Sequence, residues 1–184
     1  MPDSAVAALD ATEFDTALGR CAIAWRADAV AQFYLPGHDP DTTPARLIGA
    51  DARWLPAPAD GPRAAAIARI RAHLDGETDD LRAIALDLSG IPEFHRAVYA
   101  VTRAIDPGRT LTYGEVAERS GAVGAAQAVG QALGRNPIPL IVPCHRVLAA
   151  DHALHGFSAP GGIETKRRLL AIERTPGFGE PTLF

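Results

Sequence analysis

Residues 112–137 read TYGEVAERSGAVGAAQAVGQALGRNP and determine the fold of the second half of the chain. Thr112 and Glu115 have the spacing of a capping box, so a helix is expected to begin there and to end at Ser120-Gly121. A second helix follows, because apolar residues share one helical face at Ala125, Ala128, Val129, Ala132 and Leu133. Two short helices joined by a glycine-containing turn predict a helix-turn-helix.

The exposed face of this helix pair carries almost no bulky side chains. Glycines stand at positions 114, 124, 130 and 134. Most helix pairs of this kind only pack against their neighbours, but a face of small residues can approach another surface very closely. DNA binding is therefore one interpretation of this pattern, and simple packing is the other.

Downstream, residues 138–147 read IPLIVPCHRV and place Cys144 between a proline and a histidine. A buried, inert cysteine is the simplest interpretation. However, His145 can accept the thiol proton directly or through one water, and the nearby prolines make the backbone rigid, as a positioned nucleophile requires. Glu173 lies late in a final helical segment, 163–173, where its carboxylate could hold the other nitrogen of the histidine. A Cys–His–Glu relay would then be complete.

Upstream of the helix pair, apolar residues recur at helical spacing from Phe94 to Ile105, and the stripe ends at residues 106–108, Asp-Pro-Gly. The first half has a different pattern. Residues 21–25 and 29–35 indicate two strands joined by a tight turn, and the segment from Pro62 to Gly76 indicates a helix that buries Ile67, Ile70 and Leu74. The alternation of Ile84, Leu86 and Leu88 predicts another strand, residues 38–44 a loop, and the first dozen residues disorder.

Composition and charge limit the classes of protein to which this chain can belong. The 184 residues suit one large domain or two small ones. The net charge of −4 excludes a bulk polyanion binder, but residues 1–88 carry −6 and residues 89–184 carry +2, so a polyanionic partner should meet the second half. Two cysteines exclude a disulfide scaffold and a cysteine-rich zinc site, which favours a reducing cytoplasm. We expect neither a signal peptide nor a membrane span.

Taken together, these motifs carry a resemblance to a known family. Asn136-Pro137 followed by PCHRV at 143–147, with TYGE at 112–115 and GFS at 156–158, resembles the O6-alkylguanine-DNA alkyltransferases, or methylated-DNA–protein-cysteine methyltransferases. The close match covers roughly residues 94 to 173. Relatives unable to transfer an alkyl group have tryptophan where this chain has Cys144, so the resemblance favours the active branch.

The resemblance implies a fold and a domain organisation. Residues 1–88 would form a variable α/β (α+β) N-terminal domain with a small ribonuclease-H-like sheet. Residues 89–184 would form a mainly α winged helix-turn-helix domain that binds DNA and accepts the alkyl group. It implies a monomer that docks in the minor groove of double-stranded DNA carrying O6-alkylguanine and also repairs O4-alkylthymine. It implies no metal and no cofactor.

The resemblance also implies roles for individual residues. Cys144 would take the alkyl group in a single, irreversible in-line displacement, with His145 and Glu173 drawing off the thiol proton. Asn136 would tie the helix-turn-helix to the acceptor segment. The remaining residues would contact the flipped guanine or the DNA: Tyr113 at the 3′ phosphate and the base, Phe157 as a pocket wall, backbone groups of Val147 and Ser158 at the base edge, and Ala125, Gln127, Ala128 and Arg135 on the DNA-facing helix. Arg146 and Lys166 would be structural.

Two positions depart from the family pattern. Gln127 stands where the family usually has an arginine that fills the gap left by the flipped base; glutamine can still bond the orphaned cytosine, but it is shorter and uncharged, so less efficient flipping is expected. The loop GFSAPGG is two residues longer than the short GYSGG form, and His155 replaces an expected glycine, which leaves the range of alkyl groups open.

Two other functions stay open from the sequence alone. A lesion sensor would bind damaged DNA without efficient transfer, and a cysteine hydrolase or acyltransferase would use Cys144 and His145 on another substrate. An adjacent Cys-His pair is unusual for such hydrolases. The other five histidines have no ligand spacing, so we expect surface or packing roles and no zinc for His38, His73, His95, His152 and His155.

Overall fold

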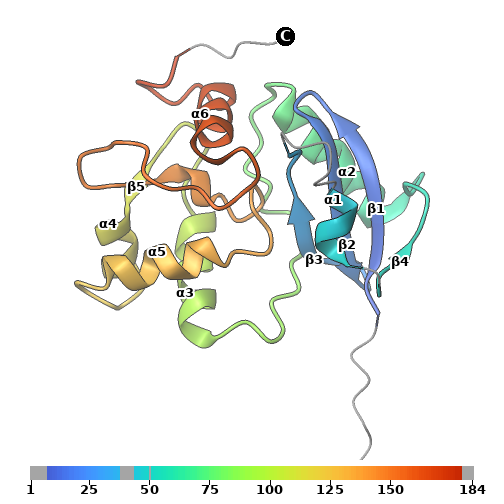
Figure 1. Ribbon diagram of the computed structural model, residues 1–184, viewed down its shortest axis with the longest axis horizontal. Coiled ribbons are helices and arrows are strands. Elements are labelled where there is room, and N and C mark those ends of the chain that lie inside the picture. The colour runs from blue at the N-terminus through green and yellow to red at the C-terminus, as the bar shows by residue number, and fades with distance from the viewer. Residues whose placement is uncertain (1–7, 38–43, 50, 180–184) are drawn as a thin grey trace, which may run out of the picture.

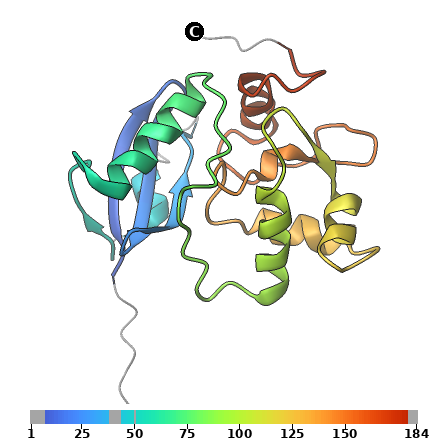
Figure 2. The same cartoon turned by 180° about the vertical axis from the view of Figure 1, so that it is seen from behind.

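The computed structural model describes residues 8–37, 44–49 and 51–179 and has a mixed α/β fold (Figure 1). Strands dominate the first half and helices the second, and the two halves lie side by side (Figures 1 and 2). Within the described ranges, no helix is long and apolar enough to cross a membrane.

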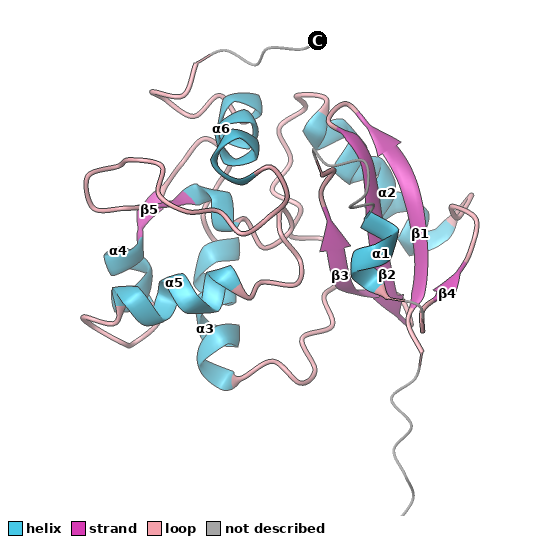
Figure 3. Ribbon diagram, viewed as in Figure 1, coloured by secondary structure: helices cyan, strands magenta, loops and turns pink. Residues whose placement is uncertain are grey.

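A four-stranded sheet with the order β3-β2-β1-β4 forms the centre of the first half (Figure 3). Its strands are β1 (Asp10–Thr16), β2 (Gly19–Arg26), β3 (Ala29–Tyr34) and β4 (Arg53–Trp54). The first three strands are joined by tight turns and pair antiparallel, whereas β4 pairs parallel with β1. The strands predicted at residues 21–25 and 29–35 are confirmed as β2 and β3.

Helices cover both faces of this sheet. The long α2 (Gly61–Leu74) lies on one face and the short α1 (Pro44–Ile48) on the other (Figures 1 and 2). For this reason five consecutive residues of β2, from Cys21 to Trp25, are buried, where a sheet covered on one face would bury alternate residues. The predicted face of α2, with Ile67, Ile70 and Leu74, is buried as expected.

The structure corrects two expectations about irregular segments of the first half, one at residues 10–12 and one at Pro44. Residues 10–12 are not disordered, because they begin β1 and pair with β2 along the whole strand. Backbone pairing of this kind needs little from the side chains, and Phe14 is the one large apolar residue of β1. The predicted loop at 38–44 falls mainly outside the described residues, but Pro44 already belongs to α1.

The predicted strand at residues 84–88 was wrong. Only Leu86 pairs, in an isolated bridge with Val30, through one hydrogen bond from the Val30 N–H to the Ala85 carbonyl and one from the Asp87 N–H to the Val30 carbonyl, both 2.8 Å. The Asp87 carboxylate then accepts the Ser89 N–H at 2.9 Å, which turns the chain away from the sheet. The alternation of apolar residues at 84, 86 and 88 therefore reflects burial beside β3, although the segment does not form a continuous run of strand hydrogen bonds with it.

The described part of the second half, up to residue 179, contains four α-helices, one 3₁₀ turn and a short parallel pair of strands. They are α3 (Glu93–Arg103), β5 (Leu111–Thr112), α4 (Tyr113–Arg119), α5 (Ala126–Gly134), the 3₁₀ turn η1 (Cys144–Arg146), β6 (Val147–Leu148) and α6 (Gly162–Ile172). The capping box at the start of α4 is confirmed: the Glu115 N–H donates to Thr112 Oγ1 at 3.2 Å and the Thr112 N–H donates to Glu115 Oε2 at 2.7 Å. Tyr99 of α3 donates to the Ala132 carbonyl at 2.9 Å and fastens α5 against α3.

One hydrophobic core runs through both halves. Phe33 of β3 and the buried residues Ile138 and Val142 belong to the same cluster of contacting side chains. The Phe33 N–H also donates to the Pro137 carbonyl at 2.9 Å, which fixes the edge of the sheet against the segment that leads to Cys144. The sheet therefore directly supports residues 136–144, which we call the acceptor segment after the role that the resemblance implies for Cys144.

Candidate active site

Cys144 is the first residue of η1. The segment that precedes it, residues 136–143, is restrained by hydrogen bonds and by its backbone conformation. Asn136 anchors this segment at both ends: its Nδ2 donates to the Val142 carbonyl at 2.9 Å and its Oδ1 accepts the Ile138 N–H at 3.0 Å. Leu140 has a left-handed backbone with φ of 72°, a conformation that a branched residue adopts only when its surroundings impose it. The cysteine is 6% exposed, so its sulfur is accessible only through the cavities beside it.

The predicted partner of the cysteine, His145, is fully buried and contacts Glu173. Its Nε2 lies 2.8 Å from Glu173 Oε1. Burial would raise the pKa of Glu173, but hydrogen bonds from His145, His73 and Arg146 hold it well below its ordinary value. The carboxylate is therefore ionised, and His145 Nε2 carries the proton that it donates.

This hydrogen bond defines the state of the other ring nitrogen. Burial lowers the pKa of His145, although the Glu173 carboxylate opposes that effect, so the imidazole is neutral near pH 7. With its proton on Nε2, a neutral ring has its lone pair on Nδ1. Nδ1 has no hydrogen-bond partner within the described part of the chain. His145 is thus arranged to accept a proton at Nδ1.

The cysteine itself rests in the thiol form. Burial raises its pKa, while Asn136, the charge of Lys166 and the backbone amides of Cys144 and His145 partly offset that effect by favouring the thiolate. A thiol in this environment becomes nucleophilic only when a base accepts its proton. The arrangement therefore needs the neutral His145 beside it.

Arg146 and Lys166 have the structural contacts that were expected for them. Arg146 is 0% exposed; its Nε and Nη2 donate to the two oxygens of Glu173 at 3.0 and 2.8 Å, and its Nη1 donates to the Ile105 carbonyl. Lys166 Nζ donates to the Val147 carbonyl at 2.7 Å and lies 5.9 Å from the centre of the Tyr113 ring. That bond occupies one lone pair of the Val147 carbonyl, which leaves one for any ligand.

Two cavities have Cys144 in their lining. The first, of about 320 Å³, contains four of the predicted site residues, and its lining is Tyr113, Gly130, Leu133, Gly134, Cys144, Gly156, Phe157, Ser158 and Lys166. Its lining combines the aromatic residues Tyr113 and Phe157 with the polar residues Ser158 and Lys166, a composition that suits a flat heterocycle with hydrogen-bonding edges.

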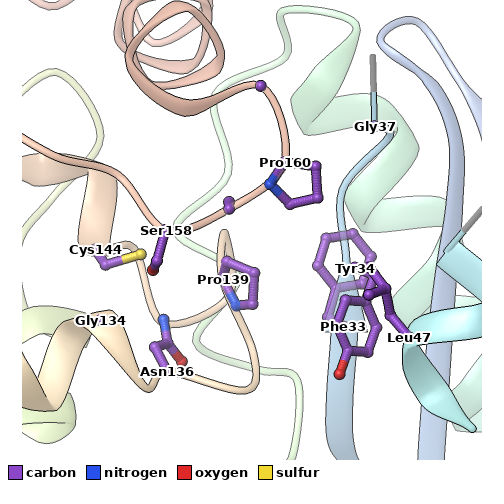
Figure 4. Close-up of a pocket in the computed structure, with 12 residues that line it drawn as sticks. Phe33, Tyr34, Gly37, Leu47, Gly134, Asn136, Pro139, Cys144, Ser158 and Pro160 are labelled. Atoms are coloured by element: carbon purple, nitrogen blue, oxygen red, sulfur yellow. The ribbon is translucent and has the colours of Figure 1, made fainter. Parts of the chain in front are cut away.

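The second cavity, of about 450 Å³, lies between the acceptor segment and the sheet (Figure 4). Cys144 points toward Ser158, and Phe33, Tyr34 and Leu47 of the first half face it from the other side. The remaining lining residues are Gly37, Gly134, Asn136, Pro139, Ala159, Pro160 and Gly161. Its wall is mainly apolar, and nothing in the sequence indicated that the first half takes part in the site.

Tyr113 lines the first cavity, whereas the residues predicted for the DNA-facing helix lie on α5 and its ends and line neither cavity. Gln127 and Arg135 are exposed, whereas Ala125 and Ala128 are half-buried. The structure thus separates them from the acceptor group and leaves the two polar side chains accessible to a partner.

One contact of the site was missed. His73 of α2, expected to be a surface or packing residue, is buried with its Nε2 3.0 Å from Glu173 Oε1. It lies on the same helical face as Ile70 and Leu74, and a polar ring on an apolar face was the available signal.

Comparison with known proteins gives concordant findings. Residues 93–175 match the family model described as 6-O-methylguanine DNA methyltransferase, DNA binding domain. The chain is 42% identical to the methylated-DNA–protein-cysteine methyltransferase of Mycolicibacterium paratuberculosis over 155 residues, which is 82% of this chain and 90% of that protein. Its fold is similar to that of Mycobacterium tuberculosis OGT in complex with DNA, with a TM-score of 0.72, 34% identity, and coverage of 92% and 96% of the two chains.

A more distant structure agrees. The O6-methylguanine-DNA methyltransferase of the hyperthermophilic archaeon Pyrococcus kodakaraensis matches with a TM-score of 0.68 and 27% identity. The match covers 89% of this chain and 98% of that one, so both halves of the fold are included.

Proposed function

Since the chain belongs to the methylated-DNA–protein-cysteine methyltransferase family, we propose that Cys144 is the acceptor through which it repairs O6-alkylguanine in DNA. It is a DNA-repair methyltransferase that transfers the alkyl group to itself. The observation that supports Cys144 is its place in the lining of both cavities, next in sequence to a neutral His145 held by an ionised Glu173.

The proposed transfer is a single displacement. The Cys144 thiol gives its proton to His145 Nδ1, directly or through one water, and the sulfur attacks the alkyl carbon from the side opposite O6. The S–C bond forms as the C–O6 bond breaks, O6 keeps the electron pair, and the guanine takes up the proton that His145 received. Glu173 stabilises the imidazolium that exists between these two proton transfers. The product is a thioether, so each molecule acts once.

DNA docking follows from the helix pair in the second half. We assign residues 1–88 to an N-terminal domain with a ribonuclease-H-like sheet and residues 89–184 to a winged helix-turn-helix domain, with α5 entering the minor groove. The O6 carbon cannot be reached inside a duplex, so the damaged base must rotate out of the stack into the first cavity. A single chain supplies the acceptor, the relay and both cavities, which supports action as a monomer.

The second cavity extends the proposed range of substrates. A base in the first cavity would present its O6 substituent at Cys144, where the second cavity begins. A volume of about 450 Å³ with Phe33, Leu47 and Pro139 in its wall suits apolar groups larger than methyl. Benzyl is a convenient representative of that class.

The direct test is an intact mass measurement. After incubation with a duplex that contains one O6-methylguanine, the protein should gain a single methyl increment, and peptide mapping should place it on Cys144. Free O6-benzylguanine should give a single benzyl increment at the same residue. A duplex with unmodified guanine is the control. Binding without any increment would indicate a lesion sensor instead, which the completed relay does not favour.

Replacing Gln127 by arginine should accelerate repair in duplex DNA and leave the reaction with the free base unchanged. Extrusion of a paired base costs a few kcal/mol, and an arginine in the vacated position offsets part of that cost by donating to the orphaned base and attracting phosphate. Gln127 is exposed on α5 and outside both cavities, so the substitution should not alter the chemistry at Cys144. We expect an increase of about tenfold in the second-order rate constant on duplex O6-methylguanine.

The control is the neighbouring exposed Gln131→Arg, which adds the same charge elsewhere on α5. It should raise general DNA affinity slightly without the same gain in rate. Equal acceleration by Gln127→Arg on duplex DNA and on free O6-benzylguanine would show that position 127 acts on the pocket, contrary to this assignment.

A further inference from the structure

His73 connects the first half of the chain to the relay. It lies near the end of α2, 100 residues before Glu173, and only 1% of it is exposed. Its Nε2 is 3.0 Å from Glu173 Oε1, the same oxygen that contacts His145 Nε2 at 2.8 Å. Two histidines from opposite halves of the molecule therefore share one carboxylate oxygen.

The other nitrogen of His73 identifies it as a donor to that oxygen. The Asp79 backbone N–H donates to His73 Nδ1 at 3.3 Å. A ring nitrogen that accepts a hydrogen bond carries no proton, so the ring proton is on Nε2 and is donated to Glu173. Asp79 is itself fixed, because both its oxygens accept from Arg69 at 2.7 and 2.8 Å and one accepts the Leu81 N–H.

Both carboxylate oxygens of Glu173 accept hydrogen bonds from buried side chains. Oε1 accepts from His73, His145 and Arg146, and Oε2 accepts from Arg146. Arg146 and His145 are neighbours in η1, so they move together with the acceptor segment. Among the described donors, His73 is the one that belongs to the first half of the chain, so it holds the carboxylate from outside η1.

We propose that His73 is a positioning residue for alkyl transfer, whose Nε2–H fixes Glu173 in the orientation that His145 needs to accept the Cys144 proton. This inference rests on the proposed function of Cys144. It also gives the first half of the chain a defined part in the reaction, because α2 delivers the donor. The charged or titratable groups around the two rings are Glu173, Arg146, Cys144 and the Arg69–Asp79 pair.

The sharing of Oε1 also affects the proton affinity of His145. A donor on Oε1 withdraws part of the negative charge that would otherwise stabilise the His145 imidazolium. Loss of that donor should raise the pKa of His145 from its lowered value and move the acid limb of the transfer rate to higher pH. A ring that is already protonated cannot accept the thiol proton.

The test is a matched pair of substitutions. His73→Gln keeps a donor, because the glutamine amide reaches about as far as imidazole Nε2, whereas His73→Met has a similar length and no donor. The rate constant with free O6-benzylguanine is measured across pH for both variants, so that DNA affinity does not enter. We expect His73→Met to slow transfer about tenfold near pH 7 and to shift the acid limb upward. His73→Gln should restore most of the rate and the original profile.

The outcomes separate positioning from packing. Equal losses in both variants, in proportion to lost unfolding stability, would overturn the proposal, as would a methionine variant with the wild-type rate and profile. If His73→Met does not fold, ¹⁵N spectra of the histidine rings in the unmodified protein give the answer. An Nε2-protonated His73 supports the proposal and an Nδ1-protonated one overturns it. Failure of Cys144 itself would appear as no benzyl increment in the wild type, so the two failures are distinguishable.

Discussion

Cys144→Ser should abolish alkyl transfer while the affinity for a duplex containing O6-methylguanine stays within about threefold of the wild type. The serine hydroxyl is isosteric but far less acidic than the thiol, and His145 cannot generate a useful alkoxide from it in this buried position. The DNA-facing residues on α5 lie outside the cavities and are unchanged. Intact mass reports transfer, and fluorescence anisotropy with a labelled duplex reports binding.

Cys21 provides the matched control, because it is the other cysteine of the chain. Burial raises its pKa to about 12, a hydrogen bond with Thr16 offsets only part of that effect, and it lies in β2 and lines neither cavity. Cys21→Ser should therefore transfer at the wild-type rate. A methyl increment on the Cys144→Ser protein would point to a second acceptor, and Cys21 would then have to be tested first.

Glu173→Gln should combine a large loss of stability with a large loss of rate. The Arg146 side chain is only 1% exposed, and without the carboxylate its guanidinium stays buried and uncompensated, which costs about 3–5 kcal/mol of unfolding free energy. The His145 imidazolium also loses its counter-charge, so transfer should slow about a hundredfold. Denaturant unfolding measures the first effect and the reaction with O6-benzylguanine the second.

The same substitution should change the response to acid. Because the pKa of Glu173 is held well below its ordinary value, the ionised carboxylate fully stabilises the folded state above the unfolded pKa of about 4.3, and this stabilisation is lost as the pH falls toward the lowered pKa. Glu173→Gln should therefore flatten the decline of stability in acid. Glu164→Gln, an exposed change in the first turn of the same helix, should leave stability within about 0.5 kcal/mol. An unaltered acid response in Glu173→Gln would contradict the assignment.

Sequence patterns predicted those parts of the site that are local or continuous with a helix. The capping box at Thr112 and the helical face containing Val129 are set by neighbours within a few residues, and both are confirmed. The approach of Glu173 to His145 was also expected, because the final helix could place it there. The second cavity was not expected, since it depends on how the edge of β3 packs against the acceptor segment.

The failures have related physical causes. β1 forms because β2 satisfies its backbone, and a strand with one large apolar residue gives no clear alternation. The alternation of Ile84 and Leu86 reports burial, which a bridged loop produces as well as a strand does. The contact of His73 with Glu173 spans 100 positions and exists only after both halves have packed, so no local pattern encodes it.

The continuous core between the sheet and the acceptor segment also has a genetic consequence. Phe33 packs in one cluster with Ile138 and Val142, and its backbone supports Pro137. A substitution at Phe33 would displace the segment that carries Cys144, although the two residues are more than a hundred positions apart in the sequence. Inherited variation at the positions of the first half that touch Ile138, Val142 or Pro137 should therefore affect repair in the same way as variation beside the acceptor itself.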